Sequence, residues 1–326
     1  YLLCLSIGIA MLAGCGGSQL PIGAPGAAMQ SRELAARAAL KTSSGALIYA
    51  TNLTNNGVWV FSYPSGLLVA EIPLYYAADL GNECVDSAGN VFVAARKQSL
   101  QSGQVFEIAH GGTSPIADLA DPQVSYNCAV DPTTSTLAVT GNYVNNRPGV
   151  AFYKNATGAP TILSTKPYYV TSCTYDSSGN LYIVAGNNSK IGLLLLPAGS
   201  KKFQLMRTDV SINGHGYDGP TVQWANNHLT VSSADLSQKH RLYIYELTVN
   251  GSKARKVHTT ELATDKSDFA GQVWVQGAMV LTYTVGPRSE RGHITSWRFP
   301  NGGHPINKSG TPYGQAAYLW GLVVSQ

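Results

Sequence analysis

The sequence predicts an all-β fold, a closed ring of six four-stranded sheets, and three observations lead to it. The phrase CTYDSSGNLYIVAG at 173–186 has near copies at 128–141 (CAVDPTTSTLAVTG) and 83–95 (ECVDSAGNVFVAA). Only 12% of the residues are charged, while Gly (34) and Tyr (18) are abundant, which favours short strands joined by tight turns. The two ends of the repeating region each hold part of one further unit.

The repeat has the length of one propeller blade. The turn residue after the first strand recurs about 45 to 51 residues apart, at Asp86, Asp131, Asp176, Trp224, Val275 and Ser325. Each copy is followed by a second hairpin with a Gly- or Asn-centred turn (HGG, NATG, PAGS, NGS, PNGG). One unit therefore reads strand, turn, strand, loop, strand, turn, strand.

The two ends predict how the ring closes. The final segment GLVVSQ at 321–326 matches the first strand of a unit and then stops, and SSGALIYATN at 43–52 matches a second strand that lacks its first. We therefore expect a six-bladed β-propeller at 45–326, closed by pairing of the C-terminal strand with the N-terminal blade, which leaves no open sheet edge.

The N-terminus has the features of a processing signal. Residues Leu2 to Ala13 form an apolar run that is short for a bilayer span. The following phrase, Leu12-Ala13-Gly14-Cys15, resembles the lipobox of bacterial lipoproteins. The resemblance implies a truncated signal peptide at 1–15, lipidation of Cys15, and an exported protein anchored in the membrane of the cell envelope, on the periplasmic or cell-surface side. Residues 16–44, rich in Gly, Ala and Pro at first, predict a flexible tether.

The first repeat also carries a family resemblance. The segment LIYATNLTNNGVWVFSYPSG at 47–66 resembles the YVTN and NHL types of β-propeller repeat. Such propellers include binding scaffolds, lactonases, lyases and lipoproteins, so the resemblance implies a fold and leaves the function open.

Three cysteines remain for the folded domain once Cys4 leaves with the signal and Cys15 is lipidated: Cys84, Cys128 and Cys173. An odd number cannot all pair within the chain. Cys128 and Cys173 hold the same repeat position, so they either pack as small buried side chains or form a disulfide with each other.

An enzymatic site in the channel is the alternative function. Six-bladed lactonases of the gluconolactonase type bind a divalent ion there, and Glu83 and Asn127 hold comparable positions, so a channel Ca²⁺ is possible although no cofactor is predicted. His215 and Asp218 could serve acid–base chemistry as in a propeller lyase, or belong to a Gly-rich turn. There is no GxSxG, HExxH or P-loop motif, and the recurring Asp86, Asp131 and Asp176 are expected to cap turns.

Aromatic residues gather in the loops that enter the six inner strands. They are Tyr75, Tyr76, Tyr126, Tyr168, Tyr169, Tyr217, Phe269, Tyr313 and Tyr318. All these loops are expected on one face of the ring, around the mouth of the channel. The rings could form a rim that stacks against a ligand, or fill gaps between the blades.

These observations favour a lipid-anchored binding or protein-interaction scaffold over an enzyme. The expected ligand on the Tyr-rich face is a glycan, a peptide or an envelope protein. The net charge of +4 is small and scattered, so nucleic acid is not expected as a partner, and we expect a monomer.

Overall fold

The computed structural model describes the greater part of the domain. Its ranges are 45–75, 77–97, 102–122, 124–143, 147–187, 190–214, 219–234, 241–263, 269–285, 292–310 and 319–326. Residues 1–44, which hold the predicted signal peptide, Cys15 and the predicted tether, lie outside these ranges, as do Tyr76, His215, Tyr217, Asp218, Tyr313 and Tyr318. Within the described part, no helix is long and apolar enough to cross a bilayer.

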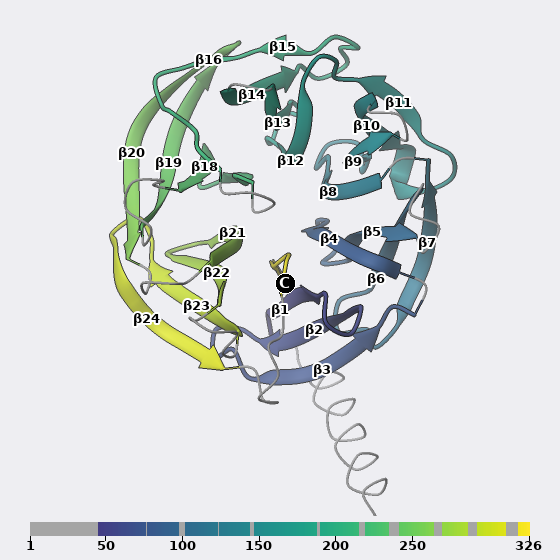
Figure 1. Ribbon diagram of the computed structural model, residues 1–326, viewed down its shortest axis with the longest axis vertical. Coiled ribbons are helices and arrows are strands. Elements are labelled where there is room, and N and C mark those ends of the chain that lie inside the picture. The colour runs from purple at the N-terminus through teal and green to yellow at the C-terminus, as the bar shows by residue number, and fades with distance from the viewer. Residues whose placement is uncertain are drawn as a thin grey trace, which may run out of the picture.

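The fold is all-β, as predicted, and its sheets are arranged around a central axis (Figure 1). Three of the sheets are consecutive four-stranded antiparallel meanders. The first holds β4 (Ala77–Val85), β5 (Val91–Lys97), β6 (Gly103–Ile108) and β7 (Pro115–Asp121). The second holds β8 (Val124–Val130), β9 (Leu137–Tyr143), β10 (Arg147–Tyr153) and β11 (Thr161–Ser164), with the 3₁₀ turn η1 (Lys154–Ala156) before β11. The third holds β12 (Tyr169–Tyr175), β13 (Leu181–Asn187), β14 (Lys190–Leu196) and β15 (Gln204–Leu205).

The eight strands from β17 to β24 form one sheet where the sequence predicts two. The first meander of this sheet holds β17 (Val222–Ala225), β18 (His228–Ala234), β19 (Arg241–Asn250) and β20 (Lys253–Ala263). The second holds β21 (Phe269–Gln276), β22 (Met279–Val285), β23 (Gly292–Arg298) and β24 (Gly302–Gly310). They join because β20 and β24 are long enough to meet at one parallel pair, Leu262 with Gly303, and β16 (Arg207–Thr208) also pairs with β20. The described residues thus form five sheets, one of nine strands.

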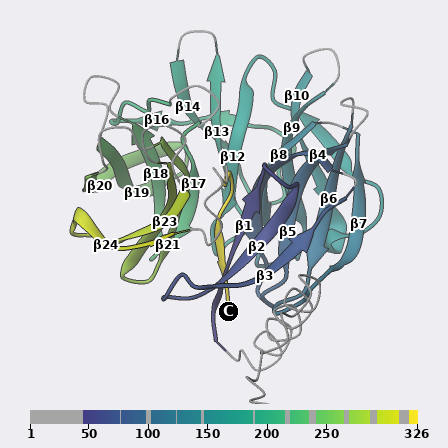
Figure 2. The same ribbon diagram turned by 60° about the horizontal axis from the view of Figure 1, so that its bottom comes forward.

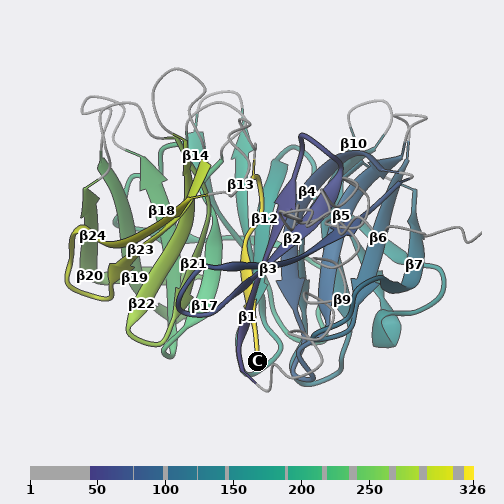
Figure 3. The ribbon, with the colours of Figure 1, turned by 90° about the horizontal axis from the view of Figure 1, so that it is seen from below.

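The remaining sheet combines the two ends of the domain. It holds β1 (Leu47–Asn52), β2 (Gly57–Ser62), β3 (Leu68–Pro73) and the C-terminal β25 (Val323–Ser325), in the order β25-β1-β2-β3. Tyr49 pairs with Val323 and Leu47 with Ser325. Figures 2 and 3 show the C-terminal segment running beside β1. The Ser325 hydroxyl donates to the carbonyl oxygen of Gly89 over 2.5 Å, which also ties the last strand to the β4–β7 sheet.

Apolar side chains hold neighbouring sheets together face to face. Strand residues alternate between the two faces of a sheet, so each sheet packs on the neighbour at either side. The described residues form six such apolar clusters, each shared by two neighbouring four-stranded units. In one of them Ile48 and Phe61 of the β1–β3 sheet meet Leu281 and Ile294 of the β21–β24 unit.

The recurring aspartates cap the turns of the inner hairpins, which confirms that prediction. Asp176 Oδ1 accepts from the amides of Ser178 and Asn180 at 2.9 Å, and Asp86 Oδ1 accepts from Ala88 and Asn90 at 2.9 and 2.8 Å. Asp131 Oδ1 accepts from the amide of Thr133. These carboxylates satisfy turn amides and are therefore structural.

Candidate functional site

A cavity of about 790 Å³ opens at the face of the ring where the inner strands begin. Its walls come from the first residues of β4, β8 and β12, from the segment before β17, and from the ends of β5 and β9. Its polar lining includes Asp79, Asn82, Arg96, Ser125, Asn142 and Thr171, and its aromatic lining is Tyr126, Tyr169 and Trp320. The volume is within the usual range of small-molecule pockets.

Local irregularities of the inner strands place these side chains. The pairing register shifts between Leu80 and Glu83 in β4, between Ser125 and Asn127 in β8, and between Val170 and Ser172 in β12. A bulge leaves its extra residue unpaired and redirects the side chain. The residues within these three shifts, Asn82, Tyr126 and Thr171 among them, line the cavity. Bulges at the same level of successive strands therefore build the site.

Below this level, buried polar side chains connect four pairs of neighbouring inner strands. Asn127 Oδ1 accepts from the Cys173 amide at 2.9 Å, and Ser172 Oγ accepts from the Val222 amide at 3.1 Å. Two more bonds of this kind follow: the Val273 amide donates to Thr221 Oγ1 over 3.3 Å, and the Leu322 amide donates to Gln272 Oε1 over 3.1 Å. We call these four bonds the inner-strand links. They satisfy buried backbone donors and hold the floor of the site in register.

Glu83 lies in β4 at the register position of Cys128 and Cys173, one residue closer to the turn than the acceptors Asn127 and Ser172, and its side chain forms no such link. Its side chain lies against Gly321, with Oε2 where a Cβ atom on residue 321 would be, and neither carboxyl oxygen has a hydrogen-bond partner among the described residues. The Thr51 hydroxyl, which is close by, donates to the Gly81 carbonyl and accepts from the Gly321 amide. Burial raises the pKa of Glu83 well above its ordinary value, and the backbone and hydroxyl of Thr51 offset only part of this rise.

The residues at this level do not suit a hard divalent cation of the kind that the lactonase resemblance implies. Burial raises the pKa of Glu83 and so disfavours the charged carboxylate that such a cation binds, and the amide oxygen of Asn127 already accepts from Cys173. The described residues contain no cluster of three or more His, Cys, Asp or Glu side chains. Glu83 and Asn127 are also absent from the cavity lining.

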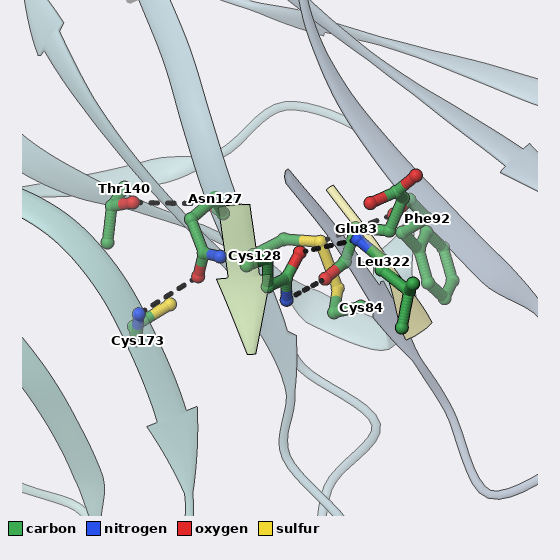
Figure 4. Close-up of a disulfide and its surroundings, with 9 residues drawn as sticks. Glu83, Cys84, Phe92, Asn127, Cys128, Thr140, Cys173 and Leu322 are labelled. Carbon is green, nitrogen blue, oxygen red and sulfur yellow. Dashed lines mark hydrogen bonds between the residues drawn. A yellow bond between two sulfur atoms is a disulfide. The ribbon is translucent and has the colours of Figure 1, made fainter. Parts of the chain in front are cut away.

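A disulfide joins β4 to β8, a pair of neighbouring inner strands that has no inner-strand link. Cys84 of β4 bonds to Cys128 of β8, and Cys173 is free and buried, as Figure 4 shows. The alternative that Cys128 forms a disulfide with Cys173 is therefore wrong. Cys128 and Cys173 each lie three residues before their turn aspartate and face the same way around the ring, whereas Cys84 lies two residues before Asp86. The offset of one residue turns Cys84 toward the β8–β11 sheet, where Cys84 and Cys128 share one apolar cluster.

The structure separates the predicted aromatic residues into different surroundings. Tyr126 and Tyr169 line the cavity, and Tyr169 is 45% exposed. Tyr168 is half-buried against the apolar cluster between the β8–β11 and β12–β15 sheets, so it fills a gap between units. Tyr75 is 79% exposed and does not line the cavity. Phe269 begins β21, and the other predicted rings, with His215 and Asp218, lie outside the described residues.

Sequence reasoning missed the polar side chains contributed by second strands. Arg96 lies near the end of β5 opposite Asp79, with Arg96 Nη1 4.0 Å from Asp79 Oδ2, and Asn142 lies near the end of β9 opposite Val124. Three buried atoms of the lining have no hydrogen-bond partner among the described residues: Arg96 Nε, Asn82 Oδ1 and Asn142 Oδ1. The antiparallel pairing of each inner hairpin could have predicted these residues. It places the end of the second strand beside the start of the first, where the cavity opens.

Comparison with known proteins identifies the fold. The sequence matches no family model and no curated protein. Its structure is similar to a chain of a nidogen/laminin complex (12% identity, TM-score 0.61, covering 86% of this chain and 99% of that one). It is also similar to TolB from Acinetobacter baumannii, with 11% identity and a TM-score of 0.61 over 86% of this chain and 67% of that one. A protein of unknown function from Bacteroides caccae is similar as well, with 11% identity and a TM-score of 0.59 over 87% of this chain and 100% of that one. At these identities the likeness extends to architecture alone: the chain has a β-propeller fold.

Proposed function

We propose that the protein is an exported, lipid-anchored β-propeller of six blades that binds a ligand in the cavity at the channel mouth. The observation that carries the proposal is the contrast between two levels of the channel. At the floor, the inner-strand links satisfy buried backbone amides, and the carboxyl group of Glu83, which has no partner among the described residues, is turned onto Gly321. At the mouth, Arg96 Nε, Asn82 Oδ1 and Asn142 Oδ1 are buried without a partner beside two tyrosines. A buried polar group without a partner costs roughly 1–3 kcal/mol, which a bound ligand would offset.

The count of six units and the closure of the ring have separate support. The six apolar clusters each join two neighbouring four-stranded units, including the pair formed by the β21–β24 unit and the β1–β3 sheet. The pairing of β20 with β24 involves a single residue pair near the ends of two long strands, so we count two blades in the nine-stranded sheet. A closed ring would hold the walls of the cavity in fixed positions, as a binding site requires.

The lipid anchor would place this cavity at the cell envelope. The phrase Leu12-Ala13-Gly14-Cys15 supports the anchor, and the Gly-, Ala- and Pro-rich stretch that follows supports a tether between membrane and propeller. Glycans, peptides and envelope proteins are the ligands available in that compartment.

A binding assay against cell-envelope fractions tests the proposal. The full chain carrying Cys15→Ser would be purified, immobilised and exposed to fractionated envelope extract. We expect a fraction that binds this protein and that loses at least tenfold in affinity for the added pair Tyr126→Ala and Tyr169→Ala. Tyr75→Ala is the matched control, because Tyr75 is exposed outside the cavity, and it should bind like its parent. Equal binding by all three proteins, or binding by none, would contradict the proposal.

A further inference from the structure

The chemistry of the cavity narrows the ligand class, and this step rests on the proposed function. Two of the partnerless atoms, Asn82 Oδ1 and Asn142 Oδ1, are hydrogen-bond acceptors, and the third, Arg96 Nε, is a donor. Asn82 is only 9% exposed and lies on the cavity wall. A ligand that satisfies all three must both donate and accept within a short distance. Hydroxyl groups do both.

The charge of the cavity favours an uncharged ligand. Of the described residues that line it, Asp79 and Arg96 carry charge, and they compensate each other across 4.0 Å. A phosphate or a polyanion is normally recognised by several cationic groups, and a cationic ligand needs an excess of carboxylates or an aromatic cage. The single pair of Asp79 and Arg96 provides an excess of neither cationic groups nor carboxylates. Asp79 can accept from a hydroxyl group and Arg96 can donate to one without a change in net charge.

The aromatic lining favours a ring with apolar faces. Tyr126, Tyr169 and the half-buried Trp320 provide flat apolar surfaces beside the polar groups. A pyranose ring carries C–H groups on its faces and hydroxyl groups around its edge, so it can stack on such a surface while its edge reaches the amides. The volume of about 790 Å³ leaves room for a short oligosaccharide rather than one sugar unit alone.

An extended peptide suits the site less well. Peptides that add to a sheet bind through free main-chain groups of an edge strand. Here the inner-strand links already use the amides of Cys173, Val222, Val273 and Leu322. We therefore propose that the cavity binds a neutral carbohydrate, stacked on Tyr126 or Tyr169 and hydrogen-bonded to the side-chain amides of Asn82 and Asn142.

Titration calorimetry with chemically defined ligands tests this proposal. The full chain carrying Cys15→Ser would be titrated with neutral oligosaccharides, uronic-acid oligosaccharides and unmodified peptides. We expect binding of at least one neutral oligosaccharide, weakened at least tenfold by Asn142→Ala and by Tyr169→Ala and unchanged by Tyr75→Ala. The unfolding midpoint of Asn142→Ala should equal or exceed that of its parent, because the lost oxygen has no partner within the fold.

Other outcomes separate this inference from the proposed function. If peptides or acidic oligosaccharides bind in the cavity and neutral ones do not, the carbohydrate proposal is wrong while the binding function stands. If no ligand binds and the envelope fractions also show no binding that depends on Tyr126 and Tyr169, both are wrong. If Asn142→Ala unfolds at a much lower temperature, its amide serves the fold, and the assignment of Asn142 to the ligand fails.

Discussion

The carboxyl group of Glu83 lies against Gly321, in the space where any other residue at 321 would place its Cβ atom. Glu83 belongs to the inner strand β4, and Gly321 belongs to the segment before β25. Their contact is where the regular inner-strand links stop: Gly321 has no side chain to accept a hydrogen bond, and Glu83 is turned toward it. The start and the end of the domain therefore meet through complementary shapes.

We expect Gly321→Ala to destabilise the protein. The new Cβ would collide with the Glu83 carboxyl and lie 2.8 Å from the Asn82 Cα, so overpacking should lower the free energy of unfolding by about 1–3 kcal/mol. Urea denaturation measures the change. Adding Glu83→Ala should recover part of the loss, since it removes the carboxyl group that lies nearest to the new Cβ, while the close approach to Asn82 remains. Gly192→Ala is the control, because no atom lies within 4 Å of a Cβ built there. Equal stability of Gly321→Ala and the parent would contradict the packing described.

Glu83 should make the protein less stable as the pH rises. The pKa of Glu83 is raised in the folded state, so above about pH 4.5 the unfolded chain loses this proton while the folded chain keeps it. The free energy of unfolding then falls with pH, by up to about 1.4 kcal/mol per pH unit for one group, until the raised pKa is passed. Glu83→Gln should remove this contribution and stabilise the protein at neutral pH.

Paired denaturation curves of the parent and Glu83→Gln between pH 4 and pH 8 measure the effect. The pKa values of Glu71 and Glu107 are also raised by burial, but both proteins share these groups, so the difference between the curves isolates Glu83. A difference that stays constant with pH, or that shrinks as the pH rises, would contradict the assignment.

The disulfide should be found between Cys84 and Cys128. Peptide mapping without reduction should recover these two residues in one linked peptide. Cys173 should react with alkylating reagents only after unfolding, because it is 4% exposed and burial raises the pKa of its thiol. The bond closes a loop of 44 residues, so the chain-entropy model assigns it about 4 kcal/mol of stability. A linked peptide containing Cys128 and Cys173 would overturn the arrangement.

The proposed lipid anchor depends on Cys15. We expect the parent protein in the membrane fraction of cells and the Cys15→Ser variant in the soluble fraction, because lipid chains supply the membrane affinity. Fractionation followed by immunodetection measures the distribution, with Cys173→Ser as a control that also removes a thiol but should remain in the membrane. Membrane retention of Cys15→Ser would show that another feature holds the protein there.

The sequence predicted the blade hairpins because its repeats combine apolar alternation with a turn aspartate such as Asp176. It predicted the source of the cavity walls, the loops and first residues of the inner strands, which include Tyr126 and Tyr169. It did not predict Arg96 or Asn142, because their side chains reach the cavity through strand pairing and bulges, which leave no local signature. Cys84 was missed as a partner because the decisive feature is an offset of one residue between two copies of the repeat.

The decisive measurement is a crystal structure of the Cys15→Ser protein with a ligand that it binds in solution. We expect density for the ligand in the channel-mouth cavity, against Tyr126 or Tyr169 and within hydrogen-bond distance of the Asn82 and Asn142 amides. Density at another surface, with the cavity unchanged and affinity intact in the Tyr126→Ala and Tyr169→Ala variant, would show that the cavity is not the binding site.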